Sequence, residues 1–228
     1  YILAGLPFIA PDYSSAWLLK DVQMEYLQEK FDKKGLMILY TAPWPGQGFY
    51  TKFPVNSVSD FSGKKLRIYS TATQQMGSML GFNATILPFA EIPQAFSTGL
   101  IEALFTSPQT GIDIQAWDNT KHFTYAGAIF SKNAVVATKK AFNALSKGDQ
   151  SNMLAAAKKA ELRGWEMSAE TTKKQIDILK KNGMSSKNAP DEVISKMKSI
   201  GLEMMKNWRS KASPCLLYTS DAADESDR

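Results

Sequence analysis

The chain has 228 residues, of which 44% are hydrophobic and 21% are charged, a balance typical of a folded protein with one large core or two modest ones. Its apolar runs fall far short of the roughly 20 residues that a membrane-spanning helix needs. The single Cys215 excludes an internal disulfide, and the single His122 has no cluster of cysteines or carboxylates around it. The sequence therefore predicts no metal site and no cofactor.

The net charge of +5 comes from lysines spread along the chain, without arginine-rich runs or interleaved aromatic residues. This pattern is typical of a solvated surface, and a nucleic-acid partner is not expected. The excess positive charge is expected to attract anionic solutes over a distance.

The first part of the chain predicts one helix and two strands. Residues 12–33 form an amphipathic helical pattern, and residues 36–41 and 48–53 have the composition of strands. The segment between these strands, residues 43–47, is rich in turn-forming residues.

Residues 63–119 alternate regularly between strand and helix patterns. We expect strands at 65–70, 84–87 and 102–106, and helices at 73–80, at 90–98 and from 112 onward. Gly81 and Gly99 follow the first two helices, where a left-handed residue commonly ends a helix. The order βαβαβα predicts a parallel sheet and an α/β fold.

The last part predicts a strand at 134–138, a long helix at 147–182 and a final helix at 190–208. Ser146 and Asp149 have the spacing of a capping box for the long helix. Its apolar residues recur at spacings of three and four, which predicts one buried stripe: Leu162, Trp165, Ala169, Thr172, Ile176 and Leu179. This helix is long enough to brace two lobes.

Open parallel sheets bind ligands beyond the carboxyl ends of their strands. In this chain those positions are Ser70-Thr71, Pro88-Phe89 and Thr106-Ser107. Hydroxyls and one aromatic ring favour a hydrogen-bonding, non-catalytic pocket.

Arg67 interrupts a strand that should be apolar if both faces of the sheet are covered. A buried guanidinium needs an anionic partner, and an external carboxylate would receive two parallel hydrogen bonds from it. The alternatives are an internal pair with Glu91, Asp60 or Glu102, or a strand end at which Arg67 extends into solvent.

No other residues assemble into an acid–base pair or a nucleophile triad. His122 is expected to be structural or exposed, and Phe8, Trp44 and Phe89 fit either a core or a pocket. The sequence thus names no catalytic residue and favours a binding protein over an enzyme.

The chain resembles the solute-binding proteins of tripartite ATP-independent periplasmic (TRAP) transporters, of the C4-dicarboxylate-binding, DctP type. The segments that match in order and spacing are residues 6–8, 61–68, 88–91, 94–99, 106–108 and 143–145. The resemblance implies a type II periplasmic-binding fold, in which two lobes close by a hinge on a small organic acid. It also implies a monomeric protein of the periplasm that delivers this acid to the membrane subunits of the transporter.

The resemblance also implies a division of the chain and a set of ligand-binding residues. Lobe I would comprise 1–43 and 134–172, and lobe II 44–133 and 173–212. Arg67 matches the family arginine that holds the ligand carboxylate. The other expected ligand-binding residues are Thr106, Ser107, Gln47, Phe89, Thr71, Phe8 and Trp44.

Two positions depart from the family pattern. Thr106 stands where many members have an asparagine, and Gln47 where some sialic-acid-binding members have a second arginine. A monocarboxylate, a 2-oxo acid or an aromatic acid is therefore as compatible with the sequence as a dicarboxylate.

Compared with the family's usual length, we expect that the first quarter of the mature protein, including the secretion signal and part of lobe I, lies outside this chain. Residues 213–228 resemble a translated sequencing adapter and are expected to be non-native, although a natural disordered terminus also fits their composition. Two other functions remain open: an enzyme on the same α/β scaffold that acts on a small organic acid, and a basic nucleic-acid-binding protein.

Overall fold

The structure, a computed structural model, describes residues 3–212, so the expected non-native tail at 213–228 lies outside the described residues. The α-helices are α1 (Tyr13–Asp32), α2 (Thr71–Met79), α3 (Ile92–Ser97), α4 (Pro108–Asp113), α5 (Lys139–Asn143), α6 (Lys147–Lys181) and α7 (Asp191–Arg209). The strands are β1 (Leu36–Pro43), β2 (Gly48–Thr51), β3 (Lys65–Ile68), β4 (Asn83–Ile86), β5 (Ala103–Thr106), β6 (His122–Tyr125), β7 (Lys132–Thr138) and β8 (Ser185–Asn188). Short 3-10 helices are η1 (Leu3–Gly5), η2 (Val58–Phe61), η3 (Phe89–Glu91) and η4 (Ala116–Asp118).

Six strands form one mixed sheet in the order β4-β3-β5-β2-β6-β8. The three strands predicted from the alternating pattern pair in parallel, with β3 between β4 and β5. Strand β2 runs antiparallel to both of its neighbours, and β8 pairs in parallel with β6. The predicted α/β fold with a mostly parallel sheet is confirmed, and its strand ends place Thr106 and Tyr69 at the same edge.

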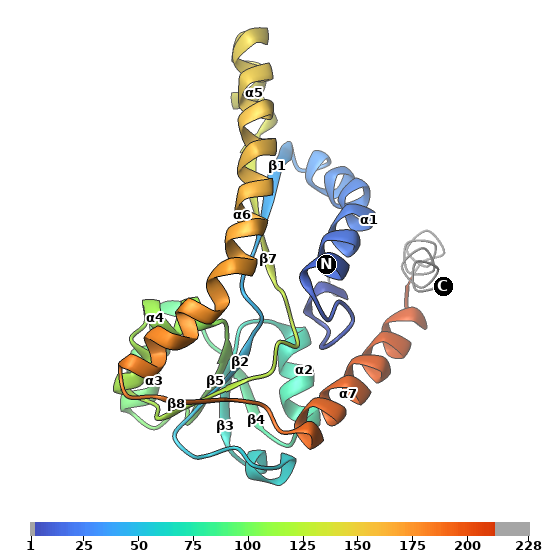
Figure 1. Cartoon of the computed structure of the whole chain (residues 1–228). Helices are drawn as coiled ribbons and strands as arrows, with labels where there is room; N and C mark the ends of the chain where they lie inside the picture. Colours follow the sequence, from blue (N-terminus) through green and yellow to red (C-terminus); the bar gives the residue numbers. More distant parts are fainter. Residues whose placement is uncertain (1–2, 213–228) are drawn as a thin grey trace.

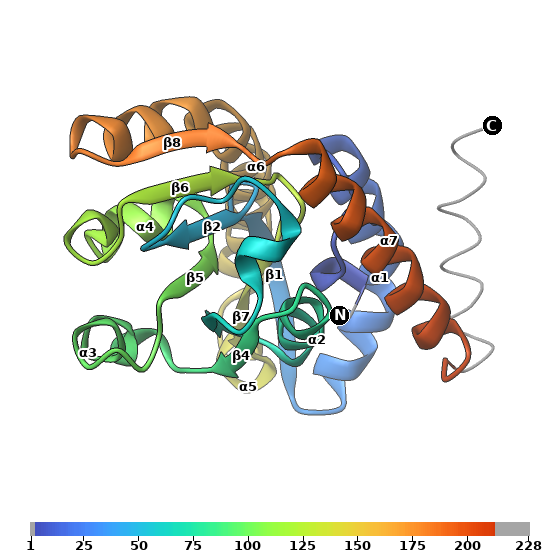
Figure 2. The same cartoon turned by 90° about the horizontal axis from the view of Figure 1, so that it is seen from below.

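The sheet is covered on both faces, as Figure 2 shows, with α2 and α7 on one side and α3 and α4 on the other. Side chains alternate between the two cores: Phe49 and Phe105 pack with α2 and α7, whereas Tyr50 and Leu104 pack with α3 and the end of α6. The alternation of strand side chains explains why Arg67 points away from the core that holds its neighbours Leu66 and Ile68.

Strands β1 and β7 form a separate antiparallel two-stranded sheet. Helix α6, 35 residues long, runs beside this ribbon and extends down to the six-stranded sheet (Figure 1). At about 1.5 Å per residue the helix spans roughly 50 Å. It therefore bridges the two sheets, as the sequence predicted.

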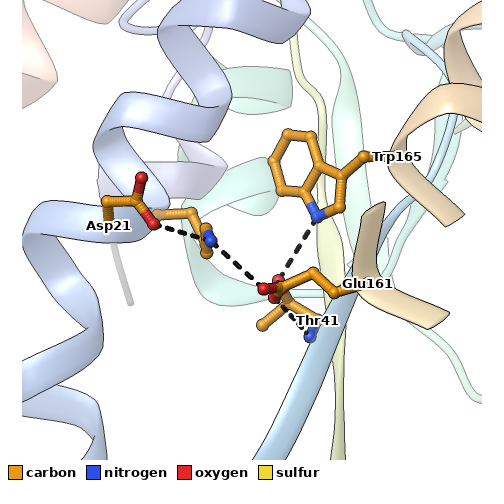
Figure 3. Close-up of polar contacts among 5 residues, drawn as sticks. Asp21, Thr41, Glu161 and Trp165 are labelled. Carbon is orange, nitrogen blue, oxygen red and sulfur yellow. Dashed lines mark hydrogen bonds and ion pairs between the residues drawn. The ribbon is translucent and has the colours of Figure 1, made fainter. Parts of the chain in front are cut away.

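A polar network fixes α6 and α1 to β1 (Figure 3). Glu161 accepts hydrogen bonds from the backbone N–H and the hydroxyl of Thr41, at 2.9 and 2.8 Å. The ammonium of Lys20 lies 3.5 Å from the other carboxylate oxygen of Glu161 and 2.6 Å from Asp21. The indole N–H of Trp165 donates to the Thr41 hydroxyl at 3.4 Å. Three segments distant in sequence are thus joined at one point.

The predicted capping and helix ends agree with the structure. The Ser146 hydroxyl accepts from the backbone N–H of Asp149 at 3.1 Å, and Gly81 and Gly99 have positive φ angles of 96° and 71°. The helix expected from residue 112 instead begins at Pro108, because the side chain of Ser107 caps it.

The predicted apolar stripe on the long helix is only partly correct. Trp165 and Leu179 are buried, but Leu162 is 53% exposed. The polar residues Ser168 and Gln175 are buried in its place. The helix packs successively against β1, α4 and β8, so its buried face changes direction along its length.

Three of the α-helices and strands were not predicted, namely β6, β8 and α5. Near the start of the chain, Leu6 is buried among residues of α2 and α7. An apolar residue in a connecting segment carries no local signal of which core it joins.

Candidate ligand-binding cavity

A cavity of about 550 Å³ lies where the carboxyl ends of β3 and β5 meet the start of β7. Its volume is within the range of pockets for small ligands. The lining residues are Ala4, Gly5, Gln23, Trp44, Gln47, Arg67, Tyr69, Ser70, Thr71, Ala72, Phe89, Thr106, Ser107, Thr110, Ser131, Lys132 and Asn133. They include two cationic side chains and no carboxylate, so the cavity favours an anion.

Arg67 is the buried cation of this cavity, with 5% of its surface exposed. Its Nε donates to the backbone carbonyl of Leu87 at 3.0 Å, which orients the guanidinium. Among residues 3–212, no carboxylate lies within ion-pair distance of Arg67, so the expected internal alternatives, Glu91, Asp60 and Glu102, are not its partners. Burial lowers the pKa of Arg67 from its usual value because the charged form is desolvated.

Two helix starts bring hydroxyls to the cavity. Ser70 caps α2 and Ser107 caps α4, each accepting a hydrogen bond at 3.2 Å, from the backbone N–H of Thr73 and Thr110 respectively. Thr71, the first residue of α2, is exposed at the cavity. The amino-terminal end of α2 adds positive potential beside Arg67.

Gln47 connects three segments of the wall. Its side-chain oxygen accepts from the hydroxyl of Tyr69 at 2.8 Å, and its side-chain nitrogen donates to the Ser131 hydroxyl at 2.7 Å. Burial raises the pKa of Tyr69 to about 12, so this hydroxyl stays protonated and can donate. Since Gln47 is 2% exposed and already engaged at both ends, it mainly positions the loop between β1 and β2.

Lys132 is the second cation of the lining, at the first residue of β7. Burial, together with the nearby positive charge of Lys20, lowers its pKa to about 8. Sequence reasoning missed Lys132, along with Tyr69, Thr110 and Ser131. The polar triplet of residues 131–133 directly after the apolar residues 126–130 is the signal that could have found it.

Seven of the eight residues expected to bind ligand lie on this cavity: Arg67, Thr106, Ser107, Gln47, Phe89, Thr71 and Trp44. Phe8 does not. It packs against the core formed with α7, where the Lys198 ammonium lies 5.6 Å from its ring centre. The backbone of Phe8 is left-handed, with φ of 58°.

In the described part of the chain, no group of three or more His, Cys, Asp or Glu residues is placed to hold a metal ion. None of the helices within residues 3–212 combines the length and hydropathy that crossing a bilayer requires.

Residues 2–211 match the sequence model of the DctP family, the bacterial extracellular solute-binding proteins of family 7. The chain belongs to this family. The resemblance derived from the sequence is therefore confirmed, and the fold agrees with it.

Three solved structures share the fold over nearly the whole chain. DctP7 of Bordetella pertussis, an extracytoplasmic solute receptor that binds pyroglutamic acid, is 37% identical, with a TM-score of 0.92 over 96% of this chain and 73% of its own. DctP6 of the same organism, also a pyroglutamic acid receptor, is 34% identical, with a TM-score of 0.93 over 98% of this chain and 74% of its own. A marine metagenome TRAP solute-binding protein specific for pyroglutamate is 31% identical, with a TM-score of 0.90 over 98% and 74%.

A curated solute-binding protein of Chromohalobacter salexigens is 24% identical over 181 residues, which are 75% of this chain. The chain spans about half, 53%, of the length of that relative.

Proposed function

We propose that the protein captures a small organic carboxylate outside the cytoplasm and delivers it to the membrane subunits of a TRAP transporter. The observation that carries the proposal is Arg67, a buried guanidinium on the cavity wall that no carboxylate of the described chain neutralises. Burying such a charge without a partner is costly, and an external carboxylate removes this cost by accepting charge-assisted hydrogen bonds.

The remaining lining residues support a compact acid. Hydroxyls of Thr71, Thr106 and Ser107 offer hydrogen bonds, and the rings of Trp44 and Phe89 cover apolar surface. The three relatives at 31–37% identity bind pyroglutamate, a cyclic monocarboxylate. We therefore infer that a monocarboxylate of this size, rather than a C4-dicarboxylate, is the ligand.

Capture would proceed by closure of two lobes. Lobe I comprises residues 1–43 and 134–172, and lobe II comprises residues 44–133 and 173–212. The division is supported by the two separate sheets, which meet at the cavity and are bridged by α6. A ligand that contacts both sheets favours the closed state because only that state makes both sets of contacts. The location is proposed to be the periplasm, as the family's extracytoplasmic members indicate.

Calorimetry on the full-length protein tests the proposal. Pyroglutamate and other small monocarboxylates are expected to bind, and their primary amides are not. The substitution Arg67→Gln should cost at least about 2–5 kcal/mol of binding free energy, since it removes the buried charge partner. Arg163→Gln, which removes an exposed arginine on α6, is the matched control.

The ligand-free Arg67→Gln protein should be at least as stable as the wild type, because Arg67 has no anionic partner to lose. Binding is thus separated from folding. Unchanged affinity in Arg67→Gln, or equal binding of acids and amides, would refute the proposal.

A further inference from the structure

Lys132 is a charged residue of the cavity lining that has no role in the proposed binding of a carboxylate by Arg67. It opens β7 opposite Pro43 of β1, so it belongs to the two-stranded sheet. Arg67 belongs to β3 of the six-stranded sheet. The two cationic residues of the lining therefore approach the same cavity from different sheets.

The ammonium of Lys132 has no partner in the described part of the chain. It makes no hydrogen bond there, and the four ion pairs of residues 3–212 do not include it. Its side chain also borders a small second pocket lined by apolar residues such as Ala16, Leu19 and Phe130. Lys132 is half-buried, and residues 3–212 supply no counter-charge that offsets this burial.

The charged groups near Lys132 do not replace such a counter-charge. Lys20 approaches from α1 and repels it, and the carboxylates of Asp21 and Glu161 are already paired with Lys20. Arg67 faces the same cavity from β3. Residues 3–212 therefore supply no acceptor for the Lys132 ammonium.

We propose that Lys132 is a second ligand-binding residue, whose ammonium donates to an oxygen acceptor that the bound acid carries beside the carboxylate held by Arg67. The inference rests on the proposed function and narrows its substrate class to small acids with such a second oxygen. An acid of this kind connects Arg67 on one sheet with Lys132 on the other, whereas an acid with a carboxylate alone offers Lys132 no second oxygen.

The lowered pKa of Lys132, about 8, adds a measurable signature. Contact with an oxygen acceptor favours the protonated form and raises this pKa in the complex. Ligand binding is then accompanied by proton uptake at Lys132, at pH values from just below 8 up to the raised pKa. A lysine with a purely structural role would not couple proton uptake to this ligand.

Two acids that differ in one oxygen provide the test. In 3-oxocyclopentanecarboxylate the ketone lies at the same ring position, relative to the carboxylate, as the lactam carbonyl of pyroglutamate. Cyclopentanecarboxylate lacks this oxygen. The Lys132→Met substitution keeps the apolar length of the side chain, and Lys140→Met removes an exposed lysine of α5 as the control for charge.

Affinities are measured by calorimetry at pH 7, and proton uptake at pH 8.5 by repeating the titration in buffers of different ionisation enthalpy. The wild type should bind the keto acid more tightly, and Lys132→Met should lower its affinity about tenfold or more, as the loss of one charge-assisted hydrogen bond predicts. Affinity for cyclopentanecarboxylate should change little, and proton uptake with the keto acid should disappear in Lys132→Met but not in Lys140→Met.

Equal losses for both acids in Lys132→Met, or proton uptake that persists in that variant, would overturn the inference and leave the Arg67 clamp intact. Failure of the wild type to bind any carboxylate would instead overturn the proposed function. The two failures are thus distinguishable.

Discussion

Glu161 holds both hydrogen-bonding groups of Thr41, its backbone N–H at 2.9 Å and its hydroxyl at 2.8 Å, through a single carboxylate oxygen. The second oxygen faces the ammonium of the buried Lys20. One side chain of α6 thereby fixes α1 and β1, and β1 is one of the two strands of the ribbon that carries Lys132. Its removal should loosen the junction between α6 and that ribbon.

We expect Glu161→Ala to lower the free energy of unfolding by about 2–3 kcal/mol, because hydrogen bonds to a charged group are lost and the Thr41 donors are left unpaired. Glu166→Ala, at an exposed position of the same helix, should change it by less than about 0.5 kcal/mol. Denaturant titration of both variants measures the difference. Equal stabilities would show that the network does not fix α6.

Two helical glycines should respond in opposite directions to alanine. A Cβ at Gly111 would lie 2.0 Å from the hydroxyl oxygen of the fully buried Tyr50. We expect Gly111→Ala to cost about 1–3 kcal/mol or more, since the ring has to move within a packed core. Gly148→Ala, at an exposed site on α6 with ample space, should stabilise by about 0.5–1 kcal/mol.

Thermal or denaturant unfolding of the two glycine variants checks the opposite signs. A neutral Gly111→Ala would mean that Tyr50 can leave its site beneath α4 without loss. The hydroxyl of Tyr50 lies 3.2 Å from the Ser107 carbonyl, so ligand affinity should fall in this variant as well.

The free energy of unfolding should depend on Lys132 in a defined pH window. Its folded-state pKa of about 8 is below the usual value of 10.5. At pH values between these two pKa values, the unfolded state binds more protons than the folded state. Lys132 therefore lowers the free energy of unfolding by its full amount below about pH 8, and by less as the pH rises. Lys132→Met should therefore stabilise the ligand-free protein at pH 7, and the advantage should shrink as pH rises toward 10.

Unfolding curves of the wild type and Lys132→Met at pH 7, 8, 9 and 10 measure this difference. Lys140→Met, which removes an exposed lysine of α5, is measured in the same way as the control for the loss of one positive charge. A constant difference in Lys132→Met would mean that the amine titrates as it does in water.

Phe89 should contribute to affinity but not to folding. Its side chain lines the cavity and is 52% exposed. Closure over a bound acid would bury this ring, so we expect Phe89→Ala to weaken binding about tenfold through lost apolar burial. Leu202→Ala, at a position 69% exposed on α7, should leave affinity unchanged.

Calorimetry with pyroglutamate and a melting curve for each variant separate the two effects. Loss of stability in Phe89→Ala, with affinity unchanged, would place this ring in the core rather than in the binding site.

Much of the fold could be predicted because its signals are local. The alternation of strand and helix patterns between residues 63 and 119 predicted three parallel strands, and Gly81 and Gly99 predicted the helix ends. Strands β6 and β8, at one end of the sheet, were missed, since each is four residues long and contains polar side chains. Their pairing depends on partners more than 60 residues apart in the chain, which no local pattern records.

The sequence by itself determined the family and the order of the elements between residues 63 and 106. It also singled out Arg67, because an arginine within an apolar strand stands out against its immediate neighbours. Only the tertiary structure decided that Phe8 lies away from the cavity and that Lys132 lines it. A lysine at the start of a strand looks the same in sequence whether it faces water or a pocket. Its environment depends on how α1 and the six-stranded sheet pack around it, and that packing is set by contacts between residues far apart in the chain.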